Sequence, residues 1–259
     1  MNSSTGAAES SISLKKSVSA DPLNRLAVAL DFPSAQPALD FVDRLEGSCR
    51  WLKVGMELFY GAGNPLLETL RKRGFQIFLD LKLHDIPNTV AGAVRSVAHS
   101  GASLLTIHAS GGEAMIRAAA EAAAVPGAPR LLAVTVLTSM DSAQLSGIGI
   151  ADSPAQQVLR LAKLAEQAGG NQLGMVCSAE EVALLRAQLA PETALVVPGI
   201  RPAGAALGDQ RRVATPASAI ASGASMLVVG RPITQAPDPA AAARAILAEI
   251  SAEIARATA

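Results

Sequence analysis

The feature that most constrains the fold is an alternation of short apolar runs and helical segments that repeats eight times along the chain. Strands and helices that alternate at a spacing of roughly 25 to 40 residues are typical of (β/α)₈ barrels. Strands are expected at 26–30, 51–56, 76–83, 103–108, 131–137, 173–177, 194–197 and 226–229. Helices are expected at 35–45, 65–73, 87–100 and 178–189, with one that follows Gly112 and ends at about 124, one that begins near 154 and one that begins at 239.

We therefore predict an α/β protein with a single domain, a (β/α)₈ TIM barrel, over residues 22–259. An open doubly wound sheet is the alternative. It is disfavoured because the eight repeats form one unbroken series and because no glycine-rich dinucleotide-binding turn follows the first strand.

The third expected strand lies in the segment FQIFLDLKLHDIPNTV, residues 75–90. Alternation along a strand places Phe78, Asp80 and Lys82 on one face and the intervening aliphatic side chains on the other. Asp and Lys are almost never fully buried unless they are paired, so this face needs an explanation. A structural ion pair is one explanation. A catalytic acid and base is the other. After the strand, Pro87 is expected to start the next helix.

Other polar side chains also fall at or near the ends of expected strands, which is where barrel enzymes place their active sites. Taken singly, each has a structural alternative: Asp31 caps the following helix, Lys53 pairs with an acid, His84 is a turn residue and His108 is a satisfied histidine at the barrel mouth. No function is assigned to His99. The joint pattern favours a site, made of Asp31, Lys53, Asp80, Lys82, His108, Thr138, Ser139, Arg201 and Arg231.

The last two strand exits predict a phosphate site. They carry Gly199 and Arg201, then Gly230 and Arg231. Glycines let backbone N–H groups approach an anion, and a guanidinium binds phosphate oxygens with two parallel hydrogen bonds. A surface role is the alternative for Arg231. The long connection over 199–214 is interpreted as a lid or, alternatively, as a mobile loop.

Composition excludes several other classes of protein. The formal net charge is zero and aromatic residues make up 3%, so neither nucleic acid nor an anionic membrane is an expected partner. No apolar run is long enough to cross a bilayer. Cys49 and Cys177 match no metal spacing, and a reducing cytoplasm fits them. Residues 1–21 are rich in Ser and Ala without a secretory signal, and we expect a disordered tail.

The segment DLKLHDIPNTV, preceded by LALDF and followed by VVPGIRP and VVGRPIT, resembles the orotidine 5′-phosphate decarboxylases. The similarity covers nearly the whole chain after the tail. It implies a cytoplasmic homodimer that converts orotidine 5′-phosphate to UMP without a cofactor or a metal. The shorter core Asp80-x-Lys82-x-x-Asp85 also occurs in similar metal-dependent sugar-phosphate decarboxylases and aldolases, which remain an alternative. A non-catalytic barrel that only binds a phosphometabolite is the other.

The resemblance also implies a role for each site residue. Lys53, Asp80, Lys82 and Asp85 form a charged network in which Lys82 protonates C6 of the pyrimidine. Asp85 and Thr89 reach into the partner subunit's site. The substrate contacts are Asp31 and Lys53 at the ribose, Ser139 and Thr138 at the pyrimidine, Pro198 in the PGIRP turn, and Arg201, Gln210, Gly230 and Arg231 at the 5′-phosphate.

Overall fold

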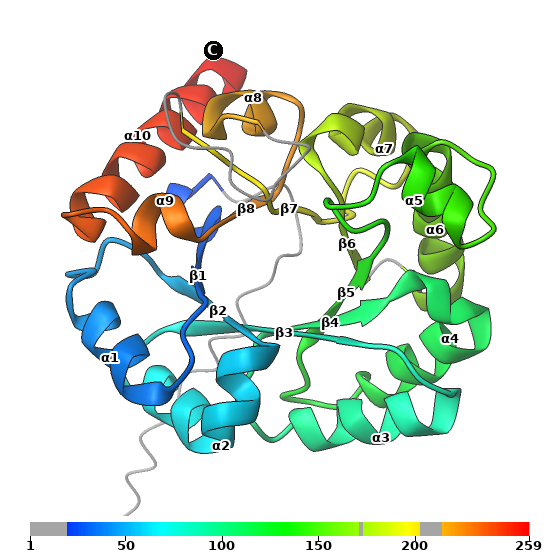
Figure 1. The fold of residues 1–259 in the computed structure, drawn as a ribbon, viewed down its shortest axis with the longest axis horizontal. Helices are drawn as coiled ribbons and strands as arrows, with labels where there is room; N and C mark the ends of the chain where they lie inside the picture. Colours follow the sequence, from blue (N-terminus) through cyan, green and yellow to red (C-terminus); the bar gives the residue numbers. More distant parts are fainter. Residues whose placement is uncertain (1–19, 171–172, 203–213, 259) are drawn as a thin grey trace, which may run out of the picture.

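The computed structural model describes residues 20–170, 173–202 and 214–258. Eight parallel strands form a closed barrel in the order β1 to β8, and each strand pairs with its neighbours in the chain, which confirms the predicted fold (Figure 1). The strands are β1 (Leu26–Leu30), β2 (Trp51–Gly55), β3 (Gln76–Leu83), β4 (Leu104–His108), β5 (Arg130–Val134), β6 (Gly174–Val176), β7 (Leu195–Val197) and β8 (Met226–Val229).

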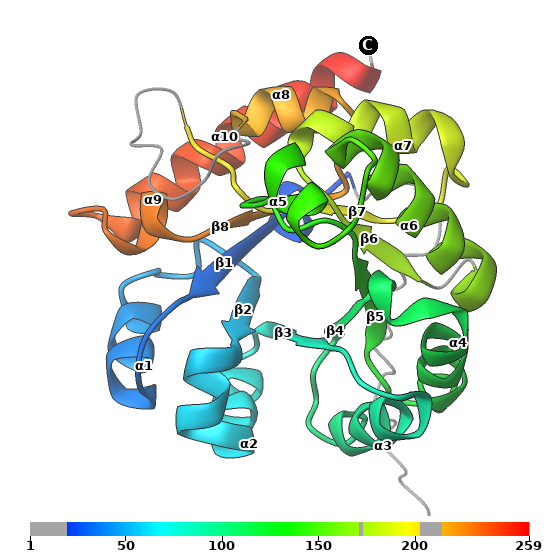
Figure 2. The same ribbon diagram turned by 45° about the vertical axis from the view of Figure 1, so that its right-hand side comes forward.

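The helices form a ring outside the strands (Figures 1 and 2). The ring closes because each helix covers the outer face of the barrel with an apolar stripe. The helices are α1 (Ala35–Asp43), α2 (Met56–Lys72), α3 (Pro87–Val97), α4 (Gly112–Ala122), α5 (Ser142–Gly147), α6 (Pro154–Gly169), α7 (Val182–Gln188), α8 (Pro216–Ala221), α9 (Arg231–Thr234) and α10 (Pro239–Thr258), with short 3₁₀ turns η1 (Pro22–Asn24), η2 (Ala109–Gly111) and η4 (Ala179–Glu181).

Alternation along the strands divides the buried apolar side chains into two groups. Phe78 belongs to the group that fills the barrel interior, whereas Ile77 and Leu79 belong to the group between the strands and the helices. This is the division predicted for β3. The interior group consists of Ala27, Ala29, Trp51, Phe78, Leu104, Leu132, Val196, Met226 and Val228. Large and small side chains together close the interior below the carboxyl ends of the strands.

Several predicted boundaries were wrong. Helix α2 as a whole begins at Met56, but the non-helical backbone at Gly63, where φ is 61°, divides it into two pieces. The predicted start at residue 65 therefore matches the second piece, whereas the first piece, in which Leu58 is buried, was not expected. The fifth strand ends at Val134 instead of residue 137. Helix α5 was not expected; Asp141 starts it with a capping box in which Asp141 and Gln144 bond each other's backbone N–H groups.

The expected tail over residues 1–21 lies mostly outside the described residues. Asp21, at its end, is described: it caps η1 and forms an ion pair with Arg50 at 2.6 Å. Asp21 is therefore part of the folded barrel domain and not of the expected tail. Within the described ranges, no helix combines the length and apolar character needed to span a membrane.

Candidate active site

The carboxyl ends of β1, β2 and β3 bring four charged side chains together. Lys53 Nζ lies 3.2 Å from Asp31 Oδ1 and 3.7 Å from Asp80 Oδ2. Lys82 Nζ donates to the same Asp80 Oδ2 at 2.8 Å. These four residues, Asp31, Lys53, Asp80 and Lys82, are called the charged cluster below. Acids and bases alternate in it, so each carboxylate lies against at least one ammonium group.

Two glycines leave room for this arrangement. A Cβ on Gly55 would lie 3.1 Å from Lys53 Nζ, and one on Gly230 would lie 3.3 Å from Asp31 Oδ2. The helix-cap alternative for Asp31 is wrong, because the N-cap of α1 is Ser34. Asp31 instead contacts Lys53 and lies beside Gly230. The carboxyl ends of β1 and β8 are therefore close to each other at the site. Sequence reasoning did not single out Gly55.

Burial makes the central part of the cluster electrostatically strong. The side chains of Lys53 and Asp80 are only 11% and 13% exposed, and Lys82 is 27% exposed. Burial by itself raises the pKa of Asp80, but the charges of Lys53 and Lys82, with hydrogen bonds from Lys82 and Thr106, bring that pKa below its ordinary value. Asp80 is therefore a carboxylate at neutral pH, and it holds two ammonium groups near one point.

The backbone at Lys82 is unusual for a strand. Its φ is +51°, in the left-handed region that a non-glycine residue seldom adopts. The pairing of β3 with β4 shifts register between Leu79 and Leu83, so Lys82 lies within a bulge. Thr106 of β4 occupies this gap, where its hydroxyl accepts from the Lys82 N–H at 2.8 Å and donates to Asp80 Oδ1 at 2.9 Å. Sequence reasoning missed Thr106, since a threonine in an apolar strand is ordinary.

His84 and His108 lie beside the cluster. Their rings are 5.3 Å apart between centroids. Burial, and then the charges of His84 and Lys82, lower the pKa of His108, while Asp80 opposes this shift. His108 is therefore an electrostatic neighbour of the cluster, whereas His84 is exposed in the turn after β3.

Asp85 and Thr89 do not join the cluster within one chain. Both are exposed, as is Ile86, at 67%. Among the hydrogen bonds and ion pairs of the described residues, the Asp85 carboxylate has a single partner, the Ile86 N–H at 2.7 Å. The start of α3 thus presents an acid, an apolar side chain and a hydroxyl to the outside of the molecule.

The exits of β7 and β8 place two guanidinium groups near each other. Arg201 is 8% exposed, and its backbone N–H donates to the Ala214 carbonyl at 2.9 Å. Arg231 is exposed at the start of α9. Burial, followed by the charge of Arg231, lowers the pKa of Arg201. Gly199, with φ 75°, turns the chain after Pro198. Two neighbouring cations beside glycine backbone form a site suited to an anion.

Two further predicted contact regions are the connection after β5 and the connection after β7. Thr138 and Ser139 lie in the connection between β5 and α5; Thr138 is half-buried and Ser139 is exposed. Gln210 lies outside the described residues, as does most of the connection interpreted as a lid.

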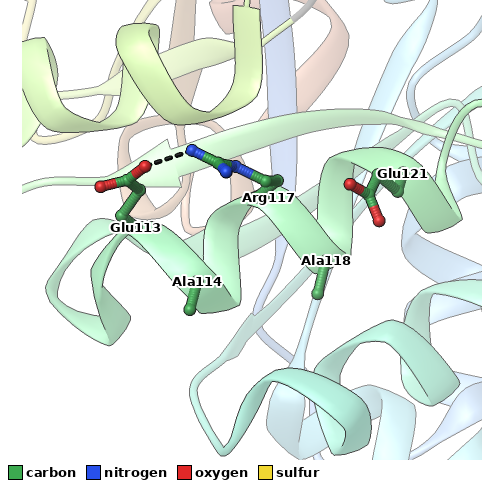
Figure 3. A pocket seen from close by; sticks show the side chains of 5 residues that line it. All are labelled: Glu113, Ala114, Arg117, Ala118 and Glu121. Atoms are coloured by element: carbon green, nitrogen blue, oxygen red, sulfur yellow. Dashed lines mark hydrogen bonds and ion pairs between the residues drawn. The ribbon is translucent and has the colours of Figure 1, made fainter.

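Surface hollows lie elsewhere. One on α4 is lined by Glu113, Ala114, Arg117, Ala118 and Glu121, with Glu113 and Arg117 joined by an ion pair (Figure 3). A second lies between α3 and α4. Neither is lined by a residue of the charged cluster. Across residues 20–170, 173–202 and 214–258, no group of three or more His, Cys, Asp or Glu side chains is placed to hold a metal ion.

The fold and the site together define a class: (β/α)₈ barrel enzymes that combine buried acid–base groups at the strand ends with an anion site after the last two strands. Comparisons with known proteins narrow this class. Residues 24–246 match the model of the orotidine 5′-phosphate decarboxylase / HUMPS family.

Similar proteins support this match over most of the chain. Orotidine 5′-phosphate decarboxylase of Halorhodospira halophila is 56% identical over 229 residues, 88% of this chain and 96% of that one. The enzyme of Anaeromyxobacter dehalogenans is 56% identical over 227 residues, 88% and 98% of the two chains. The crystal structure of the Lactobacillus acidophilus enzyme matches with a TM-score of 0.77 at 40% identity, over 88% of this chain and 99% of that one. The chain belongs to the orotidine 5′-phosphate decarboxylase family and is an enzyme, a carboxy-lyase.

Proposed function

We propose that this protein decarboxylates orotidine 5′-phosphate to UMP, the last step of de novo UMP synthesis, without a cofactor. The observation that carries the proposal is the fixed ammonium group of Lys82, held 2.8 Å from Asp80 Oδ2 in a part-buried site. The names of the relatives supply the substrate, and the geometry supplies a reason why the reaction proceeds there.

The chemistry requires a cation beside one carbon atom. When the bond between C6 and the carboxylate breaks, carbon dioxide leaves and the electron pair stays on C6, in the ring plane where no adjacent π system delocalises it. The Lys82 ammonium stabilises this charge and then transfers a proton to C6, which completes UMP. The transferred proton stays on UMP, and a new proton from solvent restores the Lys82 ammonium group. Asp80 keeps Lys82 charged and oriented throughout.

The remaining residues bind the rest of the substrate in this proposal. Asp31 and Lys53 hold ribose hydroxyls, and Ser139, with Thr138 beside it, meets the pyrimidine amide. Pro198 lies in the turn next to the phosphate. The 5′-phosphate is held by Arg201, Gln210, Gly230 and Arg231, which the paired guanidinium groups after β7 and β8 support.

The functional unit in this proposal is a homodimer. Asp85 and Thr89 are exposed at the start of α3, beside the exposed Ile86. Each would complete the other subunit's site, so that Asp85 of the partner subunit joins Lys53, Asp80 and Lys82. A mixed-subunit experiment tests this. Lys82→Ala and Asp85→Ala are each inactive, but mixed and reassociated they form heterodimers with one intact site and recover roughly a quarter of wild-type activity. No recovery by a proven heterodimer refutes the shared site.

The environment of Asp80 favours the metal-free reaction over that of the metal-dependent relatives. Its Oδ1 accepts from Thr106, and its Oδ2 faces Lys82 and Lys53 at 2.8 and 3.7 Å. A divalent cation bound at this carboxylate would lie against two ammonium groups, which repel it.

The test is the change in ultraviolet absorbance when purified protein meets orotidine 5′-phosphate in EDTA. Conversion to UMP at the same rate in EDTA and in magnesium supports the proposal. Absence of conversion by the folded protein rejects it, and the next assay then depends on a second result. Activity on sugar phosphates that requires magnesium identifies the metal-dependent alternative, whereas UMP binding without any turnover identifies a non-catalytic binding barrel.

Phosphate binding is expected to contribute to turnover as well as to affinity, because binding energy from a remote group can drive closure around the reacting part. Orotidine, which lacks the phosphate, should therefore show a lower kcat in addition to a higher KM. A change in KM alone contradicts the closure argument.

A further inference from the structure

Thr106 joins the two central residues of the charged cluster. It lies in β4 with its side chain toward the barrel interior, and it is 0% exposed. Its hydroxyl oxygen is 2.8 Å from the Lys82 backbone nitrogen and 2.9 Å from Asp80 Oδ1. One hydroxyl therefore contacts the backbone of the proposed proton donor and the carboxylate that orients it.

The direction of both hydrogen bonds follows from chemistry. A backbone N–H can only donate, so the Thr106 oxygen accepts from Lys82. The single hydroxyl proton is then left for Asp80, whose ionised carboxylate can only accept. Because Thr106 takes Oδ1, the other oxygen, Oδ2, is turned toward Lys82 and Lys53.

The backbone of Lys82 needs such a partner. The register shift between Leu79 and Leu83 interrupts the regular pairing of β3 with β4, and Lys82 adopts a φ of +51°. Strained backbone of this kind persists only where the surroundings fix it. The Thr106 hydroxyl satisfies the N–H that the bulge removes from the strand ladder, and so it stabilises the conformation from which the Lys82 side chain reaches Asp80.

We propose that Thr106 is a positioning residue for the decarboxylation: it fixes the left-handed backbone of Lys82 and the plane of the Asp80 carboxylate at the same time. This inference rests on the function proposed above. Thr106 does not touch the substrate in this account; it acts through the two residues that it holds.

The test compares Thr106→Val, which keeps the shape but removes the hydroxyl, with Thr106→Ser, which restores it. We expect Thr106→Val to lower kcat/KM roughly 10- to 100-fold, because small displacements of catalytic groups have effects of this size. Affinity for UMP should stay near the wild-type value, since the arginines after β7 and β8 are untouched. Thr106→Ser should recover most of the activity.

A pH profile separates this role from a loss of packing. Within one chain, the charged and titratable groups facing Asp80 are Lys53 from β2, Lys82 from β3 and His108 from β4. In the proposed dimer Asp85 of the partner subunit is added to them, and none of these groups is altered in the variant. Loss of the Thr106 hydrogen bond, which lowers the pKa of Asp80, should move the acid limb of kcat/KM to higher pH in Thr106→Val. Carbon-13 NMR titration of the Asp80 carboxyl should show the same shift, whether or not the wild type converts orotidine 5′-phosphate.

Thr135→Val is the matched control. Thr135 is also buried, just after β5, and its hydroxyl donates to the Val176 carbonyl at 2.8 Å without touching the cluster. This variant should leave the pH profile and the Asp80 titration unchanged. If Thr106→Val does not fold, Thr106→Cys, whose thiol is a weak hydrogen-bonding group of similar size, gives the same test.

Three results would overturn the inference: wild-type kcat/KM and pH profile in Thr106→Val, failure of Thr106→Ser to recover activity, or an equal effect of Thr135→Val. Failure of the proposed function is a different result. In that case the wild type does not convert orotidine 5′-phosphate, yet the NMR titration still reports whether Thr106 controls Asp80.

Discussion

The replacement Asp80→Asn tests how strongly the charged cluster depends on its central carboxylate. Asp80 is the carboxylate that Lys82 contacts at 2.8 Å and that Lys53 approaches at 3.7 Å. Asparagine keeps the size of the side chain but removes the negative charge, so two ammonium groups remain near one another with less compensation. We therefore expect a lower free energy of unfolding at neutral pH.

The magnitude follows from burial. Removing one partner of a buried ion pair costs about 3–5 kcal/mol. Lys53 retains Asp31 at 3.2 Å, and Lys82 is 27% exposed and so can turn toward water. The expected loss therefore lies near the lower end of that range, at about 3 kcal/mol.

The loss should depend on pH in a defined direction. Because the folded protein holds the pKa of Asp80 below its ordinary value, this carboxylate contributes stability above its unfolded pKa of about 3.9. The contribution disappears as pH falls through the folded pKa. The difference between wild type and Asp80→Asn should thus be complete at pH 7 and shrink at acidic pH.

Urea unfolding followed by tryptophan fluorescence measures this difference. The chain has one tryptophan, and Trp51 is 3% exposed in the barrel interior, so its fluorescence reports on unfolding of the barrel. Asp43→Asn is the control, since Asp43 pairs with Arg73 on the surface and exposed pairs contribute little. Equal or greater stability of Asp80→Asn at pH 7 would refute the reasoning.

Three further predictions concern other parts of the molecule. Arg201→Ala and Arg231→Ala should each weaken UMP binding roughly 10- to 100-fold in calorimetry, because a charged hydrogen-bond partner of the phosphate is lost. Binding of uridine, which has no phosphate, should stay unchanged, and an equal loss for uridine would contradict a phosphate role. Gly55→Ala should lower kcat/KM roughly tenfold, because the added Cβ would lie 3.1 Å from Lys53 Nζ. Gly147→Ala is the control, since a Cβ at Gly147 meets no atom within 4 Å, and it should leave kcat/KM unchanged. Equal rates for both variants would show that Gly55 does not constrain Lys53. Cys49, whose pKa burial raises to about 12, should resist iodoacetamide at pH 8 in the native protein and react after unfolding, as mass spectrometry would show; rapid labelling of the native protein would refute its burial.

Much of the fold followed from sequence because the signal is local and periodic. Alternation along β3 correctly divided Phe78 from Ile77 and Leu79, and the eightfold repeat led to a closed barrel. The break within α2 was predictable, because the glycines and Pro65 indicate it and the backbone is non-helical at Gly63. The helical piece before the break, which begins at Met56 and buries Leu58, was not expected. The capping-box pattern of Asp141 and Gln144 was a usable signal for α5.

The site was predicted more fully as a set of residues than as a geometry. Asp31, Lys53, Asp80 and Lys82 do meet at the strand ends. The left-handed conformation of Lys82 and the bridging role of Thr106 depend on a bulge between two strands, which no single segment of sequence reveals. The predicted roles of Asp85 and Thr89 involve a second subunit, and they stay predictions.

The most direct test of the central claim, that a fixed Lys82 ammonium group drives the loss of carbon dioxide, is the rate of UMP formation by Lys82→Ala. Lys163→Ala is the control, since Lys163 is an exposed lysine of α6 that donates a hydrogen bond to Gln188 of α7 and does not belong to the charged cluster. Electrostatic stabilisation and proton transfer together predict a fall in kcat/KM of roughly 10⁴-fold or more for Lys82→Ala, with UMP still bound and Lys163→Ala unaffected. A folded Lys82→Ala protein that retains activity within tenfold of the wild type would contradict the account.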